Sequence, residues 1–207
     1  MKSIMIYNSK GGSGKTTLAV NLATYYAKSG IPTTIVDLDP QQSSMQWLDA
    51  RPISKPKING TKKFNKLVKR AKNSVVIYDL PAAIYGNKLT SYIKKANIVV
   101  VPVLPSPIDM KAAKEFIQSL RSMGSVIRNR VQIGLVANRC RAHTNIFSEL
   151  DSYLLKEKGI KYVTAFRDNT NYIKSAQLGL GIFEMGEAMT AQDREEWKPL
   201  IRWIGIK

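Results

Sequence analysis

The sequence predicts an α/β domain in which helices cover both faces of a mostly parallel, twisted sheet. Six apolar runs rich in β-branched residues recur along the 207 residues, with helix-forming segments between them. We expect strands near residues 3–8, 32–37, 74–79, 97–103, 131–137 and 161–165. Polar residues end several of these runs. They should meet at one edge of the sheet, because the carboxyl ends of parallel strands lie together.

Length and composition favour a single domain over residues 1–207. The one cysteine, Cys140, cannot form an internal disulfide, and no apolar run approaches the ~18 residues that span a bilayer. We therefore expect a soluble cytoplasmic protein. The net charge of +17 and the pI of about 10.0 predict a polyanionic partner, nucleic acid first and anionic lipid second.

The first strand leads into residues 10–17, Lys-Gly-Gly-Ser-Gly-Lys-Thr-Thr. Its glycines permit backbone torsions that point N–H groups at phosphate oxygens, and the helix expected over 15–28 adds its positive end. Lys15 would reach the β- and γ-phosphates, and the Thr16 hydroxyl would bind Mg²⁺. A plain glycine turn is the alternative. The predicted ATP contacts are Gly11, Gly12, Ser13, Gly14, Lys15, Thr16 and Thr17.

Ser9 stands where the ordinary phosphate-loop motif has its first glycine. The stretch instead resembles the deviant Walker A box of the ParA/MinD family of ATPases, with the family's extra lysine at Lys10. The resemblance implies a P-loop NTPase fold, ATP and Mg²⁺ as ligands, and a homodimer in which Lys10 contacts the nucleotide of the partner subunit. A cation there would stabilise charge on the transferred phosphoryl group. An ordinary solvated lysine is the alternative.

Two later strands end on carboxylates. Asp37 and Asp39 share one face, and the run Asp-Leu-Asp-Pro-Gln is similar to the family's Walker A′ segment. This implies that Asp39 orients the attacking water and that Asp37 lies near Mg²⁺. The alternative is that both acids cap the helix beginning near Gln42. Asp79 ends the third strand as in a Walker B motif and would hold the water shell of Mg²⁺.

The run Leu-Pro-Ser-Pro-Ile-Asp-Met after the fourth strand is similar to that of short ParF-type partition ATPases. The resemblance places Pro105, Pro107 and Asp109 at the dimer interface. Asp109 is also expected to be the N-cap of a helix over 109–123. Asn138 can donate to and accept from an adenine edge, although a local backbone contact is the alternative. Arg167 would close over the adenine, as in relatives.

Basic residues concentrate in two places. Between 51 and 72 there are nine cations and no acid, beside an apolar helical stripe of Phe64, Leu67, Val68 and Ala71. This segment is either a solvated helix face or a surface for a polyanion. Near the C-terminus, residues 197–207 form either a packing helix or, less favoured, a weak amphipathic membrane anchor. The resemblance assigns sequence-independent DNA contacts to Lys174, Arg194, Lys198 and Arg202.

Taken together, the motifs resemble a ParF-like plasmid partition ATPase. Such a protein would form an ATP-dependent dimer, bind DNA non-specifically at the nucleoid, and hydrolyse ATP slowly until stimulated by a centromere-binding ParB-like or ParG-like partner. The alternatives are a ParA-like positioner of a carboxysome or chemoreceptor cluster, a metabolic phosphotransferase, and a MinD-like membrane ATPase. Membrane binding is the least favoured of these.

Overall fold

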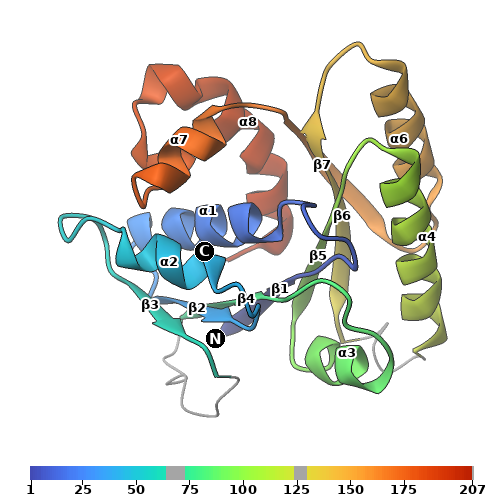
Figure 1. Ribbon diagram of the computed structural model, residues 1–207, viewed down its shortest axis with the longest axis horizontal. Coiled ribbons are helices and arrows are strands. Elements are labelled where there is room, and N and C mark those ends of the chain that lie inside the picture. Colours follow the sequence, from blue (N-terminus) through green and yellow to red (C-terminus); the bar gives the residue numbers. More distant parts are fainter. Residues whose placement is uncertain (64–72, 124–129, 207) are drawn as a thin grey trace.

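The computed structural model describes residues 1–63, 73–123 and 130–206 (Figure 1). Seven described strands form one sheet in the order β3-β2-β4-β1-β5-β6-β7, and all neighbours are parallel. The predicted fold class is therefore confirmed. The strands are β1 (Lys2–Ile6), β2 (Thr33–Asp37), β3 (Ile58–Thr61), β4 (Val75–Asp79), β5 (Ile98–Val103), β6 (Gln132–Cys140) and β7 (Lys161–Arg167).

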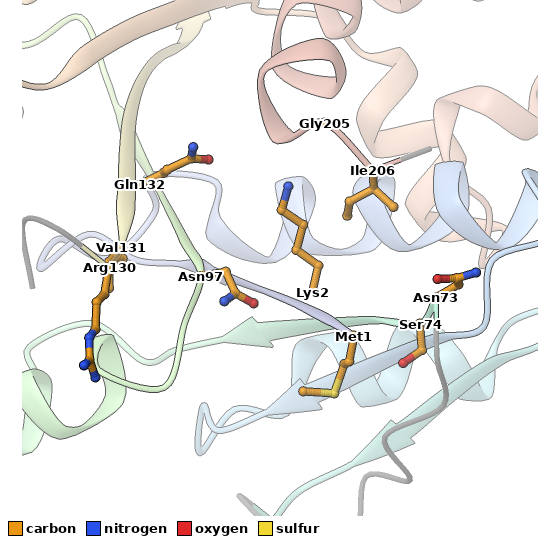
Figure 2. Close-up of a pocket in the computed structure, with 10 residues that line it drawn as sticks. All are labelled: Met1, Lys2, Asn73, Ser74, Asn97, Arg130, Val131, Gln132, Gly205 and Ile206. Atoms are coloured by element: carbon orange, nitrogen blue, oxygen red, sulfur yellow. The ribbon is translucent and has the colours of Figure 1, made fainter.

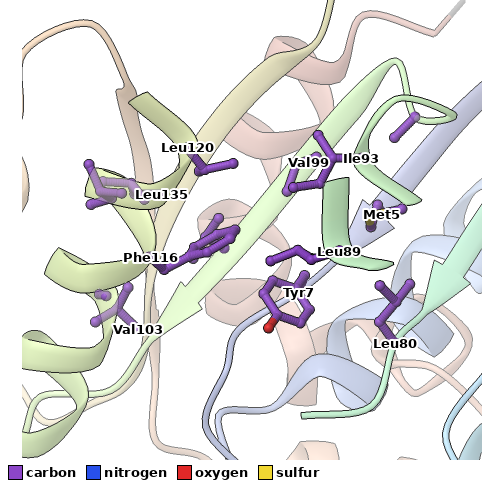
Figure 3. Packing of buried hydrophobic residues seen from close by; sticks show 14 of the residues in the cluster. Met5, Tyr7, Leu80, Leu89, Ile93, Val99, Val103, Phe116, Leu120 and Leu135 are labelled. Carbon is purple, nitrogen blue, oxygen red and sulfur yellow. The ribbon is translucent and has the colours of Figure 1, made fainter. Parts of the chain in front are cut away.

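Helices cover both faces of this sheet (Figure 1). The central strand β1 serves two separate cores, because successive side chains of a strand point to opposite faces. Met5 belongs to a core with residues of α3 and α4 (Figure 3) and of α6, whereas Ile4 and Ile6 belong to a core with residues of α1, α2 and α8. The described helices are α1 (Lys15–Lys28), α2 (Ser43–Asp49), α3 (Gly86–Ile93), α4 (Pro107–Ser122), α6 (Asn145–Lys156), α7 (Asn171–Gln177) and α8 (Glu187–Ile204), with a 3-10 turn η1 (Ile182–Glu184).

Strand β3 is not predicted from the sequence, because Asn59 and Gly60 interrupt its apolar character. It lies at an edge of the sheet and pairs with β2 alone. A Cβ at Gly60 would lie 2.6 Å from Cδ1 of Leu48, so glycine lets α2 pack closely on this strand. The apolar helical stripe predicted between residues 64 and 71 lies outside the described residues.

Helix α4 begins two residues earlier than predicted. Ser106 is its N-cap, and the Ser106 hydroxyl accepts a hydrogen bond of 3.1 Å from the backbone N–H of Asp109. Pro107 fits the first turn, where its missing N–H is not needed. The prediction that Asp109 is the N-cap is therefore wrong. Its carboxylate instead accepts a hydrogen bond from the Ser106 hydroxyl, three residues back.

The C-terminal segment forms a packing helix. In α8, the side chains of Trp197, Leu200 and Ile204 are fully buried against the sheet and α1. These contacts confirm the packing interpretation of residues 197–204. Within the described ranges, we find no helix with the length and apolar character to cross a membrane.

Candidate functional site

The glycine-rich turn between β1 and α1 needs its glycines. Gly12 and Gly14 have φ values of 75° and 91°, in the left-handed region that disfavours a side chain. A Cβ at Gly14 would also lie 2.2 Å from Nδ2 of Asn138. Gly14 is the N-cap of α1, so the positive end of this helix faces the turn. The turn thus has the backbone geometry of an anion-binding loop.

Two lysines of the turn lie in different environments. The Lys15 ammonium group is buried and donates a hydrogen bond of 2.9 Å to the backbone carbonyl of Lys10. Burial lowers the pKa of Lys15, and the charges of Asp79 and Asp39 partly offset this effect. The Lys10 side chain is exposed and takes no part in the hydrogen bonds or ion pairs of the described residues. Lys15 is therefore held inside the site, whereas Lys10 extends from it.

Asp79 is the most unusual group of the site. It faces Asp37 across the ends of β4 and β2, and neither of its carboxylate oxygens has a hydrogen-bond partner among the described residues. Burial raises the pKa of Asp79 to about 7. The nearby Thr16 hydroxyl opposes this rise, and the charges of Asp37 and Asp39 add to it. A buried carboxylate of this kind is stabilised either by protonation or by a bound cation.

The chemistry of these groups fits Mg²⁺. Asp79 and the Thr16 hydroxyl offer hard oxygen ligands beside a loop that can hold phosphates. The described residues contain no group of three or more carboxylate, imidazole or thiol side chains spaced to hold a metal ion by themselves. An ion bound here would therefore retain several waters, as Mg²⁺ does in nucleotide sites.

Asp37 and Asp39, at the same edge of the sheet, accept hydrogen bonds from nearby backbone N–H groups. The carboxylate of Asp37 accepts hydrogen bonds from the backbone N–H groups of Asp39 at 3.0 Å and Met45 at 3.1 Å. The capping interpretation thus describes Asp37 in this structure. Within the described part of the chain, the Asp39 carboxylate accepts one hydrogen bond, of 2.9 Å from the N–H of Gln41, and the residue is only half-buried. Its second carboxylate oxygen is therefore available to a water molecule in the crevice.

Asn138 lies directly against the glycine-rich turn. Strand β6 carries a positive φ at Arg139, and a register shift separates Ala137 from Cys140. The amide of Asn138 donates a hydrogen bond of 2.8 Å to the backbone carbonyl of Ser13. One of the two amide hydrogens of Asn138 is therefore bound to the glycine-rich turn. The sequence does not predict this contact. The predicted adenine contact stays a prediction.

Arg167 is anchored to α8. Its guanidinium group donates a hydrogen bond of 2.7 Å to Asp193, which is fully buried. The bond to Asp193 raises the pKa of Arg167. Burial would raise the pKa of Asp193, but hydrogen bonds from Arg167, Asn171 and Asn169 outweigh it and hold this pKa below its usual range. Asp193 was not predicted as part of the site. The sequence feature that could have indicated a buried acid is the presence of Asn169 and Asn171 after β7, because both amides donate hydrogen bonds to Asp193.

A cavity of about 390 Å³ lies between this anchored group and the glycine-rich turn. Its lining includes Thr17, Asn138, Phe166, Arg167, Asn169 and Tyr172. The mixture of an aromatic wall with amide and guanidinium groups suits a flat, polar ring. The cavity brings together Thr17, Asn138 and Arg167, which were predicted from separate parts of the sequence.

The predicted interface and DNA residues are distributed more widely. Of the predicted interface residues, Lys10 and Pro107 are exposed, whereas Pro105 and Asp109 are half-buried. Arg194 donates hydrogen bonds to the carbonyl of Met185 at 2.9 Å and to the Thr190 hydroxyl at 3.0 Å. Arg194 therefore stabilises the turn before α8, and its predicted DNA contact stays a prediction. The other predicted DNA residues, Lys174, Lys198 and Arg202, are exposed.

Arg51, at the start of the basic segment, is also committed to the fold. Its guanidinium group forms a bidentate ion pair with Glu184. The side chain of Arg51 is only 6% exposed and that of Glu184 only 3%. Arg51 also donates to the carbonyls of Gly179 and Pro56. Arg51 therefore does not contribute to an exposed polyanion surface. In the same segment, Lys57, Lys62 and Lys63 are exposed.

Comparisons with known proteins identify the family and relatives of this chain. A family model described as AAA domain matches residues 1–133. Protein ParA of Rhizobium radiobacter is 28% identical over 143 residues, covering 66% of this chain and 64% of ParA, slightly less than two thirds of that relative. Maintenance of carboxysome distribution protein A of Halothiobacillus neapolitanus is 22% identical over 192 residues, covering 89% of this chain and 88% of that protein.

The solved structure of the MinD cell division protein from Aquifex aeolicus superimposes with a TM-score of 0.76 at 18% identity, covering 100% of this chain and 98% of that one. At this identity the likeness establishes the fold. The residues that the family model matches include the glycine-rich turn and the acids that end β2 and β4. The chain belongs to the ParA/MinD family of Walker-type ATPases.

Proposed function

We propose that the protein is a ParF-like partition ATPase that binds and hydrolyses ATP with Mg²⁺. Its nucleotide-bound form would be a sandwich dimer that binds DNA without reading its sequence and associates with the nucleoid. A centromere-binding partner of the ParB or ParG type would stimulate slow hydrolysis, and the cycle would segregate plasmid DNA. The observation that carries the ATPase assignment is the buried carboxylate of Asp79, which lies close to Lys15 and the Thr16 hydroxyl and accepts no hydrogen bond within the residue ranges that the structure describes.

The residues of the site divide the work. The backbone of Gly11 to Thr17 and the Lys15 ammonium group hold the phosphates. Asp39 offers its free carboxylate oxygen to position a water for in-line attack on the γ-phosphate. When bound, Mg²⁺ would neutralise phosphate charge, held by Thr16 and by the waters around Asp79 and Asp37. Lys10 extends from the loop and would reach the γ-phosphate in the other subunit.

Two variants test this assignment. Asp39→Ala should bind ATP and form a persistent dimer while its phosphate release falls on the order of 10²-fold, because only the water-positioning group is lost. Lys10→Ala should bind ATP as a monomer. Sedimentation with ATP and a phosphate-release assay with DNA measure both. Fast turnover by Asp39→Ala would overturn its role, and a stable dimer of Lys10→Ala would overturn the cross-subunit contact.

The match to a carboxysome distribution protein over 89% of the chain supports a second candidate, a ParA-like positioner of a protein cargo. Both candidates use ATP-dependent dimerisation and hydrolysis. They differ in the cargo, which is plasmid DNA in the first and a protein assembly in the second. A plasmid-loss assay separates them. Deletion of the gene should destabilise a plasmid that carries the cognate centromere under the first proposal and should leave its inheritance unchanged under the second.

A further inference from the structure

The amino ends of the strands form a continuous edge at the far end of the sheet from the nucleotide site. The backbone N–H of Lys2 donates to Ser74 at 2.9 Å, that of Asn97 donates to Ser3 at 3.0 Å, and that of Gln132 donates to Asn97 at 2.9 Å. The starts of β4, β1, β5 and β6 therefore lie side by side. Six strand spacings of ~4.8 Å carry this edge over roughly 29 Å from β3 to β7.

Charge is distributed unequally between the two ends of the strands. Strands β2 and β4 end on Asp37 and Asp79. In the four residues that precede each strand, the described part of the chain has one acid, Glu157, which pairs with Arg121 at 2.7 Å. The described cations in these positions are Lys55, Lys57, Lys94, Lys95, Arg130 and Lys158, and Lys161 begins β7. The amino-end edge is thus strongly cationic.

Most of these cations face solvent without a counter-charge. Lys57, Lys94, Arg130, Lys158 and Lys161 are exposed, and the ion pairs of the described residues include none of them. Like charges along one edge repel one another and raise the local potential. An anion that lies along the edge would relieve this repulsion, whereas the fold itself gains little from the charges.

A polar hollow of about 540 Å³ lies in the middle of the edge (Figure 2). Asn97 and Gln132 place side-chain amides at it, and its described lining includes no carboxylate. The Lys2 ammonium group points towards the end of α8 and donates to the carbonyl of Ile204, whereas Arg130 points the other way. The cations therefore flank the hollow and do not converge on one point. This arrangement suits an extended anion better than a single ion.

We propose that this amino-end edge is a docking surface for the phosphate backbone of double-stranded DNA. The inference rests on the proposed function and adds the surface, which differs from the predicted residues of α7 and α8. A duplex carries one charge per ~1.7 Å of its axis, so an edge of roughly 29 Å faces about eight base pairs. The edge lies at the opposite end of the strands from the nucleotide crevice, so nucleotide and duplex do not compete for the same surface. A dimer paired through its nucleotide crevices would carry two such edges that face away from each other, so each would bind a separate stretch of DNA.

The test compares two double variants of the full chain that each lose two exposed cations. Arg130→Ala with Lys158→Ala removes charge from the edge, and Lys174→Ala with Lys198→Ala removes the same charge from α7 and α8. Binding of a fluorescent duplex of about 30 base pairs is followed by anisotropy across a salt series, with ADP and with a slowly hydrolysed ATP analogue. Thermal melting of each variant checks its fold.

We expect the edge variant to bind roughly 10-fold more weakly at low salt and to reduce the slope of log affinity against log salt by about 2, one unit for each lost phosphate contact. The α7–α8 variant should change the slope by less than about 1.

An edge variant with wild-type slope would overturn the docking surface while leaving the proposed function standing. Absence of duplex binding by the wild type would overturn the DNA-binding function itself. Retention of the wild type by phosphatidylserine vesicles, with loss in the edge variant and unchanged duplex binding, would assign the edge to membranes and refute our proposal.

Discussion

At the carboxyl ends of β2 and β4, Asp37 and Asp79 are almost completely buried, whereas at the amino ends of β5 and β6 Lys94 and Arg130 are exposed. The same parallel sheet therefore treats charge in two ways. Buried charge must be matched by hydrogen bonds, an ion pair or a bound cation, because its desolvation is unfavourable. Exposed charge has little effect on stability and is free to meet a partner. This difference makes one end a candidate site for chemistry and the other a candidate surface for association.

The largest effect should come from breaking a buried pair. Glu184→Ala leaves the Arg51 guanidinium buried without its partner and should lower the free energy of unfolding by about 3–5 kcal/mol. Urea denaturation measures this change. Glu195→Ala is the matched control, because it breaks the exposed pair with Lys198 and should change the same quantity by less than about 0.5 kcal/mol. Equal effects of the two variants would remove the contrast between buried and exposed charge.

Asp79 should destabilise the nucleotide-free protein. Its pKa is raised to about 7 from an ordinary value of 3.8, so the folded state binds more protons than the unfolded state between these values. Stability therefore falls as pH rises through this window, and the full penalty is present above it. Asp79→Asn should raise the free energy of unfolding by about 2–4 kcal/mol at pH 8 and leave it nearly unchanged near pH 3.5.

The same variant should lose Mg²⁺-dependent ATP affinity, since a neutral amide no longer attracts the cation. Melting curves of the nucleotide-free protein at both pH values provide the measurement. Asp39→Asn is the control and should change the melting temperature little, because Asp39 is half-exposed. A stabilisation of Asp79→Asn that does not depend on pH would show that a buried charge is not the cause.

Asn138 distinguishes a loop contact from a base contact. Asn138→Ala removes the hydrogen bond to Ser13 and should weaken ATP binding by roughly 10-fold, equivalent to about 1–2 kcal/mol. If the loop contact dominates, the affinity for GTP and for inorganic triphosphate should fall by the same factor. Calorimetric titration with all three ligands compares them. A loss confined to ATP would instead establish that Asn138 reads the adenine.

The smallest effect is expected at the amino-end edge. Lys94→Ala with Lys158→Ala should change the free energy of unfolding by less than about 0.5 kcal/mol, because both side chains are exposed and neither forms an ion pair with another described residue. Urea denaturation at low and high salt tests this value. A destabilisation of 2 kcal/mol or more would mean that these cations support the fold, and the contrast between the two ends of the sheet would fail.

The sequence was sufficient for the parallel sheet and for the phosphate loop because both depend on local patterns. Apolar runs such as Ile98–Val103 can be satisfied only when buried on both faces, and the glycines before Lys15 require torsions that other residues avoid. Strand β3 was not predictable in this way. Its short polar sequence forms a strand only because β2 and α2 are already in place beside it.

The individual roles of polar groups needed the tertiary structure. Ser106, and not Asp109, is the N-cap of α4. Arg51 forms a buried ion pair with Glu184, and Arg194 donates a hydrogen bond to the carbonyl of Met185 before α8. Each outcome depends on which partner another segment brings within hydrogen-bonding distance, and sequence spacing does not report that. The sequence by itself determined the fold class, the family and the total charge of +17. Only the structure decided where that charge is buried or exposed, because burial depends on packing between segments that lie far apart in the chain.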